Sequence, residues 1–221
     1  MRRGWWTMSG DPLERVRTAR AVGDVRAAYD DWATKYDEDV LEKHQYTGPT
    51  EVAGVFARYV ASDGAVLDAG AGTGLTGVAL RELGFGDVVG IDLSEAMLEV
   101  ARGRGVHREL RQMDLLERLD FESDRFDGVI ASGVFTAPYP LAPAFDELAR
   151  VTRPGGYVVV DLRPEHESET GSLAKFEELR ASGVWELVEE TERSPYIADP
   201  GEAPDEHVIF VHRRLRGSST R

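Results

Sequence analysis

The sequence predicts an α/β protein built on a mostly parallel sheet with helices on both of its faces. Short apolar runs alternate with stretches of helical periodicity, and such runs are typical of strands buried on both faces of a parallel sheet. The first run also leads directly into a glycine-rich turn and then into a helical pattern. The predicted strands cover residues 65–68, 88–92, 108–113, 126–132, 157–162, 184–193 and 206–213.

Composition limits the classes of function. The chain has 221 residues, of which 42% are hydrophobic and 30% charged, as in an ordinary globular domain. A net charge of −14 repels phosphate backbones, so we expect no nucleic acid partner. The absence of cysteine excludes disulfide and thiolate chemistry. No apolar run reaches the ~20 residues of a membrane span, and the N-terminus lacks the apolar segment of a secretion signal. We expect a cytoplasmic protein, a monomer or homodimer, that acts on a small molecule without a membrane partner.

The glycine-rich turn is the strongest motif, and it reads DAGAGTG over residues 68–74. A strand, a glycine turn and a helix N-terminus bring backbone N–H groups and a positive dipole end close to a ligand. Glycine leaves room for the ligand and permits positive φ. Residues 72–77 also form a G-x-G-x-x-G, which by itself would indicate a dinucleotide site. Asp68 argues against a dinucleotide, because a carboxylate at the strand tip suits an ammonium group better than a pyrophosphate.

The form D-x-G-x-G-x-G resembles the first motif of the class I S-adenosylmethionine-dependent methyltransferases. The resemblance continues with DLSEAML over residues 92–98, which is similar to the second motif, and with L-x-x-x-x-R-P-G-G over residues 148–156. It covers residues 24–162. It implies a Rossmann-like, seven-stranded, mostly parallel sheet with an antiparallel last strand, and S-adenosyl-L-methionine as the cofactor.

Acidic residues end two further predicted strands. Asp92 ends the second strand, where its carboxylate can accept hydrogen bonds from both ribose hydroxyls, at about 1.5–3 kcal/mol each. Ser94 is the expected cap of the helix that follows. Asp114 follows the third strand, and the resemblance implies that it accepts the adenine amine between apolar neighbours. The cofactor contacts expected from the glycine turn, these acids and the resemblance are Tyr36, Asp68, Gly70, Ala71, Gly72, Gly74, Asp92, Leu93, Met97, Met113, Asp114, Leu115 and Ser132.

Aromatic residues share one face of a helix predicted over residues 24–39. They form either a core stripe or, as the resemblance implies, a lid over the methionine end of the cofactor that becomes ordered when the cofactor binds. Trp32 fits both interpretations, whereas Tyr36 is expected to contact the cofactor or substrate. Tyr46 lies in the linker that follows and could join the lid.

The exit of the fourth strand, residues 132–140, would lie beside the departing methyl group. It lacks the Asn-Pro-Pro-Tyr of methyltransferases that act on amide or nucleobase nitrogens, which argues against nucleobases and glutamine as substrates. Its apolar and aromatic residues instead suggest a small organic substrate. Phe135 and Tyr139 either contact this substrate, as Trp32 and Tyr46 would, or simply pack the loop.

The predicted organisation is a single domain over residues 11–215, between a flexible tail at 1–10 and a second tail at 216–221. Within it, residues 11–61 form the helical lid and 62–215 the Rossmann-like core. The five histidines are scattered. His207 and His212 are five apart in a strand pattern and therefore point to opposite faces, so we predict no metal site.

The predicted reaction is an in-line displacement in which the cofactor supplies the activated methyl group. Alignment of the reactants can contribute about 7–11 kcal/mol, and a dedicated base is optional, so no catalytic residue is assigned. Two alternatives remain at this point. One is a protein that binds S-adenosylmethionine without transferring the methyl group. The other is an NAD-dependent oxidoreductase, for which the expected Tyr-x-x-x-Lys pair is missing.

Overall fold

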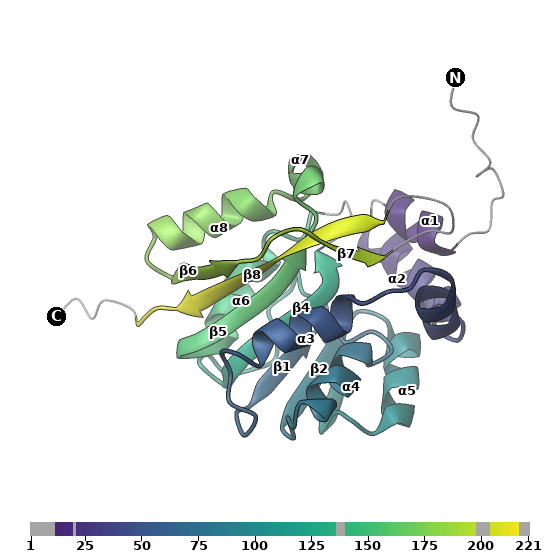
Figure 1. The fold of residues 1–221 in the computed structure, drawn as a ribbon, viewed down its shortest axis with the longest axis horizontal. Coiled ribbons are helices and arrows are strands. Elements are labelled where there is room, and N and C mark those ends of the chain that lie inside the picture. Colours follow the sequence, from purple (N-terminus) through teal and green to yellow (C-terminus); the bar gives the residue numbers. More distant parts are fainter. Residues whose placement is uncertain (1–11, 20, 136–139, 198–203, 217–221) are drawn as a thin grey trace.

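A single mixed sheet forms the centre of the computed structural model, which describes residues 12–19, 21–135, 140–197 and 204–216 (Figure 1). The strands are β1 (Val66–Ala69), β2 (Val88–Asp92), β3 (Glu109–Gln112), β4 (Phe126–Phe135), β5 (Thr152–Leu162), β6 (Trp185–Glu190), β7 (Ser194–Ile197) and β8 (Asp205–Arg214). The α-helices are α1 (Pro12–Thr18), α2 (Val22–Trp32), α3 (Gly48–Phe56), α4 (Leu75–Glu82), α5 (Glu95–Arg104), α6 (Ala144–Val151), α7 (Glu167–Thr170) and α8 (Ser172–Ala181). A π-helix (Glu38–Lys43) and a 3₁₀-helix (Pro164–His166) complete the helical elements of these residues. None of these helices is long and apolar enough to cross a bilayer.

The strand order β3-β2-β1-β4-β5-β8-β6 confirms the predicted sheet. The pairs from β3 to β5 are parallel, and β8 runs antiparallel between β5 and β6. An eighth strand, β7, pairs with β8 off this path. This segment lies between the last two predicted strands, where a turn bearing proline and glycine was expected. An edge position tolerates proline, since its missing N–H then costs no hydrogen bond of the ladder.

Two apolar layers cover the sheet, one on each face. Helices α3 and α4 pack on one face, where Phe56 and Leu80 meet Val66 of β1. Helices α6 and α8 pack on the other, in a layer that contains Leu67 and Phe145. The alternation of Val66 and Leu67 between the layers is the period of two of a strand buried on both faces. Helices therefore lie on both faces, as predicted.

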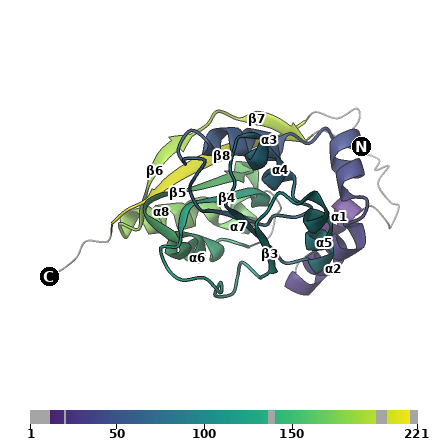
Figure 2. The ribbon, with the colours of Figure 1, turned by 90° about the horizontal axis from the view of Figure 1, so that it is seen from below.

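The N-terminal segment corrects one predicted element. The helix expected over residues 24–39 ends at Trp32, and the chain then turns into the π-helix. The indole N–H of Trp32 donates to Asp39 Oδ2 at 2.7 Å, and Asp37 is held by residues of another element, described below. These side-chain contacts outweigh the helical periodicity. Helix α2 lies beside α5 at one end of the sheet, and α1 packs against α2 (Figure 2).

His212 of β8 is buried in the α8 layer, where its ring stacks on Trp185 at 4.3 Å. Burial lowers the pKa of His212 to about 3, and the charge of Glu177 offsets this only in part. The unfolded chain therefore binds a proton near the ordinary pKa of 6.5 that the folded chain does not bind. Stability from this group is present above pH 6.5 and is lost as the pH falls.

We predict that this group alone lowers the free energy of unfolding by about 2 kcal/mol between pH 7 and pH 5. His212→Leu should remove that part of the pH dependence. Urea denaturation of both proteins at the two pH values measures it. Equal losses of stability in the parent and the variant would contradict the assignment.

Candidate functional site

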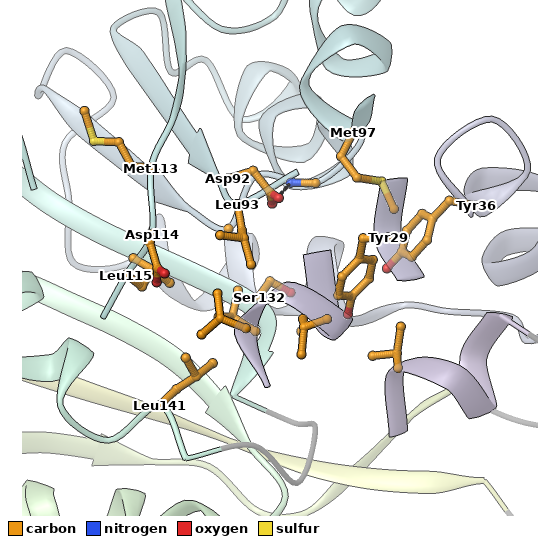
Figure 3. A pocket seen from close by; sticks show the side chains of 17 residues that line it. Tyr29, Tyr36, Asp92, Leu93, Met97, Met113, Asp114, Leu115, Ser132 and Leu141 are labelled. Atoms are coloured by element: carbon orange, nitrogen blue, oxygen red, sulfur yellow. Dashed lines mark hydrogen bonds between the residues drawn. The ribbon is translucent and has the colours of Figure 1, made fainter. Parts of the chain in front are cut away.

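A cavity opens at the carboxyl ends of the central strands, under the N-terminal helices (Figure 3). It holds about 970 Å³ of empty space, its open mouth included. Its lining residues are Val16, Val22, Val25, Tyr29, Tyr36, Gly70, Gly72, Asp92, Leu93, Met97, Met113, Asp114, Leu115, Ser132, Gly133, Val134 and Leu141.

Asp92 ends β2 and turns its carboxylate into this cavity (Figure 3). Oδ2 accepts a hydrogen bond from the Gly72 N–H and Oδ1 one from the Ser94 N–H, both at 2.8 Å. Burial raises the pKa of Asp92 to about 6; these backbone donors oppose the shift, and the charge of Asp68 adds to it. Asp92 is therefore ionised at neutral pH and retains lone pairs for a diol.

The glycine loop folds onto the end of β2. The N–H groups of Gly70 and Ala71 both donate to the Ile91 carbonyl at 2.8 Å, and the N–H of Gly72 donates to Asp92. The turn was expected to bring backbone N–H groups to a ligand, but these three are used within the protein. Gly72 has φ +51° and faces open space, since a Cβ there would meet nothing within 4 Å. The loop therefore supplies room for a ligand.

Ala71 and Gly74 were expected at the cofactor, but both lie outside the cavity lining. Ala71 is buried, and a Cβ on Gly90 would press against it. Gly74 is the N-cap of α4 with φ +91°, and a Cβ there would crowd Ala101 of α5. The structure thus uses these residues for close packing.

Asp68 is not brought to the cavity either. Its side chain is fully buried and shares a face of β1 with Val66, which points it into the protein. Asp68 Oδ2 lies 2.9 Å from His107 Nε2. The ring of His107 fills the space that a Cβ on Gly77 or Gly90 would need. The last glycine of the G-x-G-x-x-G therefore accommodates His107.

The predicted adenine contacts are brought together. Leu93, Met113, Asp114 and Leu115 line one part of the cavity, at the ends of β2 and β3 (Figure 3). Asp114 Oδ1 accepts a hydrogen bond from the Leu116 N–H at 2.9 Å. An ionised carboxylate accepts about four hydrogen bonds, so Asp114 can also bind an exocyclic amine. Met97 and Ser132 line the cavity as well.

Of the N-terminal aromatic residues, Tyr29 and Tyr36 line the cavity, whereas Trp32 does not. Trp32 is 3% exposed and packs edge-on behind Tyr36, with ring centroids 4.8 Å apart. Of its two interpretations, the geometry favours the core stripe, because its indole N–H donates to Asp39 within the protein. Burial raises the pKa of both tyrosines above its ordinary value, so both hydroxyls stay protonated at neutral pH.

The other expected substrate contacts are Phe135, Tyr46 and Tyr139. Phe135 is 2% exposed and stacks on Phe145 at 4.3 Å in the core, so of its two interpretations the geometry favours packing. Strand β4 extends to Phe135 and turns its ring into the α6 layer. Tyr46 is outside the cavity lining, with its hydroxyl placed where a Cβ on Gly133 would be. Tyr139 lies outside the described residues.

The structure adds lining residues that the sequence did not indicate as site residues: Val16, Val22, Val25, Tyr29, Gly133, Val134 and Leu141. Val25 and Tyr29 share the helical face that carries Trp32, and that face was the available signal. Leu141 precedes α6 in a segment without periodicity and gave no signal.

Hydrogen bonds attach the N-terminal segment to the glycine loop and to the two ends of α5. Asp37 Oδ1 accepts from Thr73 Oγ1 at 2.6 Å, and its other oxygen pairs with Arg104. Arg104 Nε also donates to the Thr73 carbonyl at 2.6 Å. Ser94 caps α5, as predicted, and its hydroxyl donates to Asp30 at 2.5 Å. The segment that carries Tyr29 and Tyr36 is thereby fixed over the cavity.

A series of hydrogen-bonded side chains, Asp161, His207 and Glu51, supports the exit of β4. The Gly133 N–H donates to Asp161 at 2.8 Å, and the ring of His207 lies between Asp161 (2.9 Å) and Glu51 (3.2 Å). Burial opposes protonation of His207, but hydrogen bonds and charge from Asp161 and Glu51 outweigh it and raise the pKa of the imidazole. Within the described part of the chain, no three His, Asp or Glu side chains are placed to hold a metal.

Comparisons with known sequences agree with this geometry. Residues 67–160 match a family model described as a methyltransferase domain. The chain is 31% identical over 182 residues to human methyltransferase-like protein 27, which covers 78% of this chain and 74% of that protein. It is 35% identical over 153 residues to a demethylmenaquinone methyltransferase of Clavibacter sepedonicus, covering 67% and 61% respectively.

Solved structures share the fold. The [4+2]-cyclase SpnF superposes with a TM-score of 0.67 at 18% identity, covering 90% of this chain and 98% of that one. A TehB-like S-adenosylmethionine-dependent methyltransferase from Corynebacterium glutamicum gives 0.62 at 20% identity, covering 85% and 98%. With the family match and the human relative, the chain belongs to the class I S-adenosylmethionine-dependent methyltransferases, and S-adenosylmethionine is its cofactor.

Proposed function

We propose that the protein transfers the methyl group of S-adenosylmethionine to a small organic acceptor inside this cavity. The observation that carries the proposal is the pairing of an ionised Asp92 with open space at Gly72, directly under a wall of N-terminal side chains. The part of the cavity that would bind the cofactor is then continuous with the part that would bind the acceptor. In-line displacement requires that the two molecules meet there.

Residues of the cavity match the ribose and the adenine of the cofactor. Asp92 would accept the ribose hydroxyls, and Gly72 would leave room for the sugar. Leu93 and Leu115 would flank the adenine while Asp114 accepts its amine. The bound cofactor supplies the activated methyl group, and the chain itself supplies binding and orientation.

We further propose that residues 22–47 act as a lid. Tyr29 and Tyr36 would close the methyl-donating end, and the hydrogen bonds of Asp37 and Asp30 would hold the lid shut. Exclusion of water and alignment of the reactants can together contribute about 7–11 kcal/mol. Asp68, which lies outside the cavity lining, would act only through its charge, which raises the pKa of Asp92.

No dedicated base is proposed. Among the described lining residues, the carboxylates are Asp92 and Asp114, and both are assigned to the cofactor. The acceptor would then attack as a neutral amine, a thiol or a carbanion. A small organic acceptor also agrees with the name of the Clavibacter relative, which specifies demethylmenaquinone.

Turnover with methyl-labelled S-adenosylmethionine and a pooled extract of metabolites tests the proposal. We expect label in a low-molecular-weight product, with one demethylated cofactor formed for each product. Label found only in a protein or nucleic acid fraction would contradict it, as would binding of the cofactor without turnover on any fraction.

The ionisation of Asp92 predicts how the demethylated cofactor, S-adenosylhomocysteine, binds as the pH changes. Its affinity should be steady from pH 8 to 7 and should fall as the pH drops through about 6, because the protonated acid loses acceptor capacity. Asp92→Asn should weaken binding at neutral pH by about 2 kcal/mol, and its affinity should no longer change over this range. Calorimetric titration of both proteins measures this, and a parent affinity that stays constant down to pH 5 would contradict it.

Gly72→Ala should weaken binding of S-adenosylhomocysteine, because the new methyl group enters space that the ligand needs. Gly105→Ala is a matched control, since Gly105 also has positive φ (+64°) and nothing within 4 Å of a Cβ, at the end of α5. Both variants should lose about 1 kcal/mol of stability from backbone strain. Equal affinities in the two variants, measured by titration, would place the cofactor elsewhere.

A further inference from the structure

The two sides of the cavity differ in chemistry. The strand ends contribute carboxylates and bare backbone, whereas the N-terminal helices contribute Val16 of α1 with Val22 and Val25 of α2, which we call the valine wall. Val134 of β4 and Leu141, before α6, add aliphatic surface to the lining. None of these five residues belongs to the ends of β2 and β3, to which the adenine and ribose contacts are assigned.

The valine wall is not explained by packing of the protein alone. Val16 belongs to the cluster that contains Ala28 and Trp32, but Val22 and Val25 belong to none of the apolar clusters of the described residues. Both are partly exposed and face the cavity. They lie on the helical face of Tyr29, at spacings of three and four residues along α2. This face presents apolar surface to whatever occupies the space.

The charges of the lining argue against an anionic occupant. None of the described lining residues is Lys, Arg or His, and the charged ones are Asp92 and Asp114. A phosphate or carboxylate on the acceptor would lose its hydration and find no cation in return. The net charge of −14 adds a long-range repulsion of anions.

Two hydroxyl groups interrupt this apolar side. Tyr29 and Tyr36 lie next to each other, with ring centroids 6.4 Å apart, and Figure 3 shows both rings at the cavity. As protonated phenols they can donate a hydrogen bond to one polar atom of an acceptor. They would orient that atom while the valine wall holds the rest.

We propose that the methyl acceptor is an uncharged, hydrophobic small molecule held against the valine wall and oriented by Tyr29 and Tyr36. This rests on the proposed methyl transfer within the same cavity. Val22 and Val25 are then residues that determine specificity for the acceptor, and they make no contact with the cofactor.

The test compares two probes with the same ring system, naphthol and naphthoate, binding to the full chain at saturating S-adenosylhomocysteine. We expect naphthol to bind at least about tenfold more tightly than naphthoate, because only naphthoate carries a charge that must be desolvated. Val25→Lys should reverse this preference. Ala27→Lys, on the exposed side of the same helix, should leave it unchanged. Fluorescence or calorimetric titration gives the affinities.

Equal affinity of the parent for the two probes, or binding of neither, would overturn the inference. An unaltered preference in Val25→Lys would overturn it too. The affinity for S-adenosylhomocysteine is measured separately in each protein and should be the same in all. Its absence in the parent would refute the proposed function itself, which keeps the two failures distinguishable.

Discussion

The hydrogen bond from the Gly72 N–H to the Asp92 carboxylate fixes the cofactor side of this protein. With the bonds from Gly70 and Ala71 to the Ile91 carbonyl, it ties the glycine loop to the end of the neighbouring strand. The loop cannot then rise into the cavity, and the space beside Gly72 stays open. The same bond favours the ionised form of Asp92 against the effect of burial. Loop shape and ligand recognition therefore depend on one contact.

A second acid, Asp68, is buried within the protein and does not line the cavity. Asp68 pairs with His107 in a space that exists because residues 77 and 90 are glycines. The glycine motif thus does two kinds of work, since Gly72 leaves room for a ligand whereas Gly77 leaves room for a side chain of the protein. On the far side of the cavity, the chain from Asp161 through His207 to Glu51 fixes the exit of β4 in a similar way.

Elements that depend on neighbouring residues in the sequence were predicted from local patterns. The apolar runs gave the parallel strands, and Ser94 was recognised as a helix cap. The ends of β2 and β3 placed Asp92 and Asp114 correctly, because carboxyl ends of parallel strands meet at one edge. Features decided by distant contacts were missed. The break after Trp32 depends on Asp39 and Thr73, the burial of Phe135 depends on Phe145, and the position of Leu141 depends on how the chain returns to the sheet.

The two sides of the cavity have different roles. Strand ends supply polar contacts, and the N-terminal helices supply an apolar surface that the hydrogen bonds of Asp37 and Asp30 hold in place. A crystal structure of the complex with S-adenosylhomocysteine tests this account most directly. It should show both ribose hydroxyls within hydrogen-bonding distance of Asp92, the sugar beside Gly72 and the adenine between Leu93 and Leu115. A ligand whose ribose lies away from Asp92, or whose adenine lies against Val22 and Val25, would contradict it.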